Sequence, residues 1–289
     1  KQKAQLQLKD EQQVEEPPPP PPPETKVEEP VEEVVVTETT VTEEEEALDN
    51  SETEDTSKES AFDSNQWNSA VGLGGGAGGR YGGRGGGRGG KGGKSYAAAI
   101  DAGLKWLANH QDEDGKWDCD GFMKHDAADS EICNGPGNAV HDVGITGLAL
   151  LAFLGDGSTM RAGPYKENIK KGVLWLKGQQ QENGLFGSNA SHDFVYDHAI
   201  AAYAMCEAYG LSDYKLLKKS AQKGLNYLES HRNPYSVWRY QPRDNDNDIS
   251  VTGWCIMAYE SGKFFDLTIN KSALDLCETY LDQVSDATG

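Results

Sequence analysis

A short motif that recurs four times constrains this chain more than any other feature of its sequence. Its clearest copy, Gly103 to Trp117, places a Gly three positions before an aromatic residue, and a Gln, a Gly and a second aromatic five, nine and eleven positions after it. The first aromatics of the four copies are 69, 52 and 53 residues apart; they are Trp106, Trp175, Tyr227 and Tyr280. A period of this size is typical of a fold built from stacked repeats.

Two copies of the motif are complete and two are degenerate. The complete copies contain Gln111, Gly115 and Trp117, and Gln180, Gly184 and Phe186; the third keeps Trp238 but has Arg232 for Gln and Ser236 for Gly. Each copy begins on an amphipathic pattern of helical period. We therefore expect a structural role: the Gly in a turn with positive φ, the Gln bonded to backbone groups, and the second aromatic folded over the helix end.

A second, more apolar pattern lies between the copies and aligns three times without gaps. It opens at Asp142, Asp197 and Asp248, where Asp suits an N-cap or a first helical turn. Its many Gly and Ala residues permit close packing. Each unit is thus predicted to be an outer amphipathic helix followed by a buried inner helix. The predicted helices lie near 96–110, 142–154, 166–180, 196–210, 214–231, 248–263 and 268–284.

The motif, in register with the inner helices, resembles the repeat of the terpenoid cyclase and protein prenyltransferase superfamily, in the squalene cyclase-like form of planctomycete-type bacterial envelope proteins. The resemblance covers residues 96–289. It implies an all-α fold, an α/α toroid of helical hairpins in which inner helices form a ring within the outer ones. Seven helices would form a partial, open toroid, and we expect the domain to be truncated at Gly289. Functional motifs would lie where inner helices begin, facing a central cavity.

Candidate catalytic residues follow from this resemblance. The cyclases use an acidic motif as proton donor, and the nearest match ends at Asp248, but Asn247 stands where the acid should be and cannot donate a proton. Capping is the favoured interpretation of this loop, with a hard cation as the alternative.

The prenyltransferases bind zinc through Asp, Cys and His, which makes Asp142, His141, Asp197 and His198 candidates, although no Cys lies at an equivalent helix start. A lone His there is more often structural. Candidates for lining the cavity are Tyr196, Tyr203, Trp254 and His141.

An insertion from Asp118 to Val140 lengthens the first repeat. It contains Cys119, His125 and Cys133, and His141 follows it, but their spacing is not a standard zinc pattern. In an oxidising compartment we favour a Cys119–Cys133 disulfide, with free thiols and a metal site as alternatives. Because the loop lies at the start of an inner helix, it is expected at the cavity mouth, and insertions there often carry the function of a repeat protein.

The first 95 residues differ in composition from the rest. Residues 1–70 contain 20 acidic and 5 basic residues, which predicts a disordered, Pro-rich acidic spacer. Residues 71–95 are expected to form a flexible Gly/Arg-rich linker; 15 of residues 71–94 are Gly and five are Lys or Arg. So few charges beside an acidic neighbour argue against nucleic-acid binding. No apolar run of about 18 residues marks a membrane span, so a membrane anchor is expected outside this sequence.

Two functions follow from these observations. The first is a non-catalytic or catalytically diverged module, tethered in the extracytoplasmic cell envelope, that binds an unknown protein or an apolar small molecule. The alternative is an enzyme of the terpene cyclase or prenyltransferase type, acting on an apolar isoprenoid in the cavity. No cofactor is expected, with zinc as the alternative, and a cytoplasmic location is the alternative to the envelope.

Overall fold

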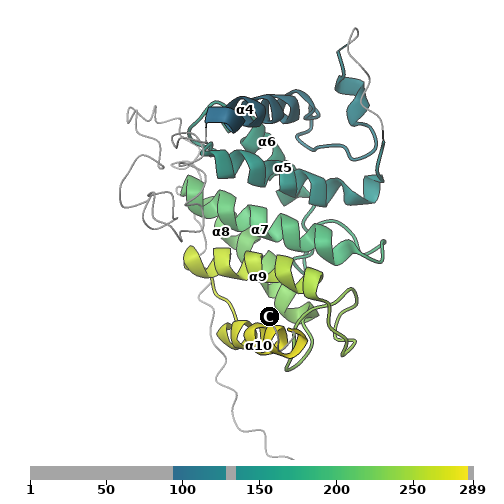
Figure 1. Ribbon diagram of the computed structural model, residues 1–289. Helices are drawn as coiled ribbons and strands as arrows, with labels where there is room; N and C mark the ends of the chain where they lie inside the picture. The colour runs from purple at the N-terminus through teal and green to yellow at the C-terminus, as the bar shows by residue number, and fades with distance from the viewer. Residues whose placement is uncertain (1–93, 128–134, 286–289) are drawn as a thin grey trace, which may run out of the picture. The chain divides into compact units, whose positions relative to one another are not determined.

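The computed structural model describes residues 94–127 and 135–285. The acidic spacer, almost all of the linker and Cys133 therefore lie outside the described residues. The chain divides into two units, 1–40 and 41–289, and every described residue belongs to the second. The described residues form seven α-helices and no β-strand (Figure 1), which confirms the all-α prediction.

The helix bounds agree closely with the predicted ones. The outer helices are α4 (Lys94–Asn109), α6 (Lys166–Gly178), α8 (Lys218–His231) and α10 (Lys271–Val284). The inner helices are α5 (Asp142–Asp156), α7 (Phe194–Ser212) and α9 (Ile249–Phe264). Three short 3-10 turns complete the described elements: η1 (Phe122–His125), η2 (Ala139–His141) and η3 (Lys215–Leu217). The last of these delays the start of α8 relative to the predicted 214–231.

The inner helices lie side by side in the order α5, α7, α9, with α6 and α8 packed behind them (Figure 1). Small residues make the close approach of α5 to α7 feasible. A Cβ at Gly144 would lie 2.2 Å from Asp197 Oδ1, and one at Gly147 would lie 2.9 Å from Ile200 Cγ2. The prediction of close packing through small residues is therefore confirmed at this contact.

The recurring motif joins each repeat to the next one. The Gln111 amide donates to the carbonyl oxygens of Gly115 (2.8 Å) and of Asn168 in α6 (2.9 Å). Gln180 repeats this geometry with Gly184 (3.1 Å) and with Ser220 in α8 (3.0 Å). We call these contacts, together with those of the second aromatic, the repeat junction.

The junction glycines are confirmed in left-handed turns, with φ of 105° at Gly115 and 94° at Gly184. Space also requires glycine there. A Cβ would lie 2.4 Å from the Lys171 carbonyl oxygen in the first junction and 2.2 Å from that of Lys223 in the second.

The second aromatic of the motif folds back over the outer helix, as predicted. The indole N–H of Trp117 donates to the Leu107 carbonyl, and that of Trp238 donates to the Leu228 carbonyl, both at 2.8 Å. The other side of this aromatic packs on the next outer helix at its motif glycine: Trp117 on Gly172, and Phe186 on Gly224. In α4 the equivalent Gly103 has nothing within 4 Å of its Cβ position.

One stretch, Ala139–Asp156, has the length and hydropathy of a membrane span, with a mean hydropathy of 1.3. This differs from the expectation that no such run exists. The stretch contains the inner helix α5, and 56% of it is buried within the structure. A core helix that is covered on several sides needs the same apolar composition as a membrane helix.

Candidate functional site

The predicted site residues lie where the three inner helices begin, but the three aspartates there have different partners. Asp142 accepts the backbone N–H of Cys119 (2.8 Å) and the ammonium of Lys116 (2.7 Å). Asp197 Oδ2 lies 2.9 Å from Nδ1 of His141. Asp248 accepts the backbone N–H groups of Ser250 and Val251, both at 2.9 Å.

Asp248 is the N-cap of α9, which confirms the capping interpretation of its loop. Burial disfavours its charged form, but the Val251 and Ser250 donors outweigh burial and hold the pKa of Asp248 below its usual range. A carboxyl group with a lowered pKa is a poor proton donor near neutral pH. The geometry therefore favours a structural role over a catalytic one for this residue.

His198 is fully buried and both of its ring nitrogens bind backbone groups. Nδ1 accepts the Phe186 N–H (3.0 Å), so the proton must be on Nε2, which donates to the Gly224 carbonyl (3.1 Å). Burial lowers the pKa of His198 to about 3. The neutral ring thus joins α7 to the second junction and to α8, and neither nitrogen is left for a metal.

The other repeats explain why a histidine stands here. In the first and third repeats a threonine hydroxyl accepts the backbone N–H of the second motif aromatic. Trp117 N–H donates to Thr146 Oγ1 (3.0 Å) and Trp238 N–H donates to Thr252 Oγ1 (3.3 Å). The second repeat has Ala201 at the threonine position, so His198 supplies the acceptor instead.

His141 and Asp197 form a hydrogen-bonded pair at the starts of α5 and α7. The bond to Asp197 raises the pKa of His141 above its usual value. The His141 side chain is 32% exposed, and its Nε2 lies 3.9 Å from the nearest oxygen of Asp193. An imidazole held by a carboxylate through one nitrogen, with the other nitrogen near solvent, has the arrangement of a general base.

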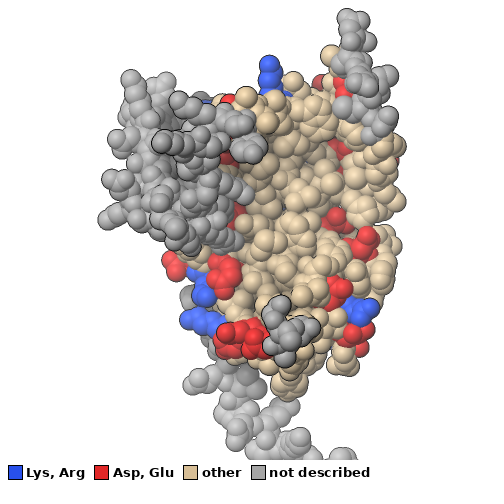
Figure 2. All heavy atoms as spheres, viewed as in Figure 1, with Lys and Arg blue, Asp and Glu red and all other residues tan. Residues whose placement is uncertain are grey.

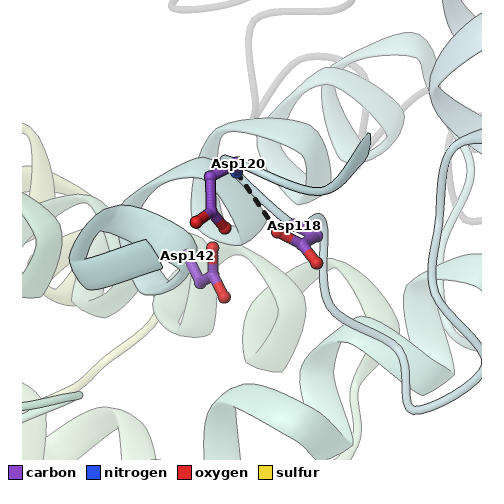
Figure 3. A group of neighbouring side chains, drawn as sticks. All are labelled: Asp118, Asp120 and Asp142. Atoms are coloured by element: carbon purple, nitrogen blue, oxygen red, sulfur yellow. Dashed lines mark hydrogen bonds between the residues drawn. The ribbon is translucent and has the colours of Figure 1, made fainter. Parts of the chain in front are cut away.

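Three carboxylates gather beside this pair: Asp118 and Asp120 from the insertion and Asp142 from α5 (Figure 3). One oxygen from each lies within 4.8 Å of the other two, which suits a hard cation. Two lysines offset part of this charge, because Lys116 lies 2.7 Å from Asp142 and Lys124 lies 3.0 Å from Asp118. Among residues 94–127 and 135–285, no other set of three or more His, Cys, Asp or Glu side chains is close enough together to share an ion. His198, His141 and Cys119 therefore do not converge on a zinc site there.

The described part of the insertion is tied to the residues just after α4 by hydrogen bonds and one ion pair. His125 Nε2 lies 2.6 Å from Asp112, Lys124 Nζ lies 2.7 Å from the same carboxylate, and His110 Nε2 lies 3.2 Å from Asp126. Three residues of this site were not among those predicted from the sequence: Asp112, Lys116 and Lys124. The alternation of basic and acidic residues between 110 and 126 could have indicated that these side chains pair with one another.

Cys119 lies beside Asp142, one of these three carboxylates. Burial raises the pKa of the Cys119 thiol, and nearby carboxylates add to the effect. A thiol with a raised pKa is a poor nucleophile at neutral pH. Its predicted disulfide partner lies outside the described residues, so the pairing stays a prediction.

The predicted cavity-lining residues lie on the exposed side of the inner helices. Tyr203 and Trp254 are half-buried, and they occupy the same repeat position as Leu148, which is 39% exposed. Tyr196 lies closer to the rim, where its hydroxyl bonds to Ser250, and burial raises its pKa to about 12. Figure 2 shows the middle of this side as largely uncharged, with acidic residues along one edge and a mixture of acidic and basic residues at the lower end.

Comparisons of the chain with protein-family models, with curated proteins and with solved structures gave no match.

Proposed function

We propose that this domain is a catalytically diverged α/α-toroid repeat module of the terpenoid cyclase-like kind, and that it binds an apolar partner on the exposed side of α5, α7 and α9. One observation carries the proposal. The same position of all three inner helices holds a large apolar or aromatic residue, Leu148, Tyr203 or Trp254, on a largely uncharged face. An apolar row of this kind on a repeat protein supports binding along the row.

The state of the candidate catalytic residues supports binding over catalysis. Asp248 caps a helix, His198 is closed off by two backbone groups, and Asp142 is neutralised by Lys116. Each of these residues has a structural partner that accounts for its presence. Within the proposal, the acidic spacer and the Gly-rich linker tether the module to an envelope anchor.

A charge on the row would test the binding proposal. Leu148→Glu should weaken binding of the apolar probe 1-anilinonaphthalene-8-sulfonate, or of a farnesyl-modified peptide, by about tenfold or more, because a buried carboxylate opposes apolar contact. Leu174→Glu is the matched control, since Leu174 is 58% exposed but lies on the outer helix α6. Equal loss in both variants, or no loss in either, would exclude the inner side as the binding site.

The His141–Asp197 pair favours a second candidate function, an enzyme in which His141 acts as general base at the rim. Purified protein would be incubated with isoprenoid diphosphates and the products separated by chromatography. This candidate predicts turnover that disappears in His141→Ala while thermal stability stays close to the wild-type value. Absence of turnover with the wild-type protein supports the binding module instead.

A further inference from the structure

We propose that the outer helices α6 and α8 form a docking surface for the acidic segment Glu43–Asp63 of the same chain. This inference is independent of what the inner face binds. The surface, called here the lysine surface, comprises the lysines of α6, η3 and α8, which are Lys166, Lys170, Lys171, Lys177, Lys215, Lys218, Lys219 and Lys223.

Positive charge dominates this surface because few carboxylates share it. Helix α6 carries four lysines and one glutamate, and η3 with α8 carries another four lysines and one glutamate. Glu229 is engaged by Arg232 at 2.8 Å, and Glu167 lies near Lys166 and Lys170 only. The other six lysines form no ion pair with any described residue, so their charge is available to a partner.

The lysines recur at equivalent repeat positions. Lys166 and Lys218 are the first residues of α6 and α8, each nine positions before a motif aromatic, and Lys171 and Lys223 each lie four positions before it. A lysine in the first turn opposes the helix dipole, which favours negative charge there. Glu167 offsets this lysine in the first turn of α6, whereas the first turn of α8 has no acidic residue, so an anionic partner would relieve the unfavourable arrangement at α8.

The two helices are neighbours, so their charges act on the same partner. Gln180, just after α6, bonds to the Ser220 carbonyl of α8. On the other side, Gln111 bonds to the Asn168 carbonyl of α6 from the end of α4. The segment N-terminal to Lys94 therefore joins the domain at α4, the outer helix next to α6.

Two other parts of the described surface disfavour an anion. Acidic residues line an edge of the inner side (Figure 2), and Asp118, Asp120 and Asp142 gather at the start of α5. Repulsion at these places directs an anionic partner to the lysine surface.

The occupant we assign is in the chain itself. Glu43–Asp63 contains ten carboxylates and one lysine, and 30 residues separate Asp63 from Lys94. A Gly-rich coil of that length has an average span of roughly 30 Å, enough to cover a helix of about 20 Å. Tethering gives the segment a local concentration on the order of millimolar, so it outcompetes free anions of similar affinity.

Carbodiimide coupling of the full chain tests the assignment, because this reagent joins carboxylates only to amines in direct contact. Peptide mass spectrometry at micromolar protein and low salt should find Glu43–Asp63 linked mainly to the lysine surface. Yields should fall by about fivefold or more in 0.5 M NaCl, where the screening length is only a few ångströms. Lys171→Glu/Lys218→Glu should lower the yield similarly. The control Lys105→Glu/Lys263→Glu, which makes the same change of charge elsewhere, should leave it within about twofold.

Three outcomes would overturn the proposal. One is an even distribution of cross-links over all lysines, and another is a yield that rises with protein concentration as intermolecular products. The third is binding of phosphatidylglycerol vesicles through the lysine surface that does not change when Glu43 to Glu46 are replaced by Gln, which would assign the surface to a membrane. Far-UV circular dichroism of each variant establishes that the helices remain formed.

Discussion

Replacing glycine by alanine at equivalent positions of different repeats should change stability in opposite directions. Gly103, Gly172 and Gly224 each lie three positions before a motif aromatic, inside an outer helix. An added methyl group at Gly103 meets nothing within 4 Å. At Gly224 it would lie 2.8 Å from Phe186 Cε2 and 3.3 Å from Ala202 Cβ.

The magnitudes follow from two opposing effects. At an open helical position, alanine is favoured over glycine by about 1 kcal/mol because it loses less backbone entropy. At Gly224 this gain is opposed by overpacking, which costs about 1–3 kcal/mol, and Phe186 is only 1% exposed and has little room to move. We expect Gly103→Ala to stabilise by roughly 0.5–1 kcal/mol and Gly224→Ala to destabilise by roughly 1–2 kcal/mol.

Thermal unfolding of the full chain, followed by far-UV circular dichroism, measures both effects. A change of 1 kcal/mol should shift Tm by roughly 2–4 °C in a domain of this size. Gly172→Ala is a second packed case, since its methyl group would lie 2.9 Å from Trp117 and 3.0 Å from Leu150. If both packed variants raise Tm as much as Gly103→Ala does, the aromatic residues do not pack on these glycines and the repeat junction is wrong.

Acid should destabilise the domain once the pH falls below about 6.5. Burial lowers the pKa of His198 to about 3 and also lowers that of His231 from the usual 6.5, so the unfolded chain takes up protons at a higher pH than the folded one. Urea midpoints measured from pH 8 to pH 5 should therefore fall. His198→Gln should reduce the dependence of the urea midpoint on pH. Asp248→Ala should cost about 1 kcal/mol by removing the cap of α9. Asp248→Ser should retain most of the stability that the cap provides, because serine also caps helices. Equal urea midpoints for the two variants would contradict the capping role. Trp238→Phe should cost about 0.5–1.5 kcal/mol because it removes the indole donor to the buried Leu228 carbonyl, which then keeps only the Arg232 backbone N–H. Faster hydrogen exchange in α8 would report the loss.

Features set by local sequence were predictable. The helix positions, the left-handed turns at Gly115 and Gly184 and the cap at Asp248 each depend on residues within one or two turns of one another. Period and turn chemistry carry that information directly.

Features that join distant residues were not predictable. Lys116 and Asp142 are 26 residues apart, and their pairing depends on how the insertion folds against α5. The sequence shows that His198 lies at a helix start, which made it a candidate metal ligand. Its role as a hydrogen-bond acceptor depends instead on the absence of threonine at position 201. The effect of this missing threonine becomes clear only from the structure, in which the backbone N–H of the second aromatic in each repeat is bonded to an acceptor on the inner helix.

The repeat junction also determines how this domain should respond to force. Each junction connects one repeat to its immediate successor, through Gln111 and Trp117 in the first case and Gln180 and Phe186 in the second. Cohesion is then a chain of nearest-neighbour terms, as in other repeat proteins. Pulled between its ends, such a domain would extend in steps, one hairpin at a time from an exposed end, so a tethered module of this kind could lose its outermost repeat under load and keep the rest folded.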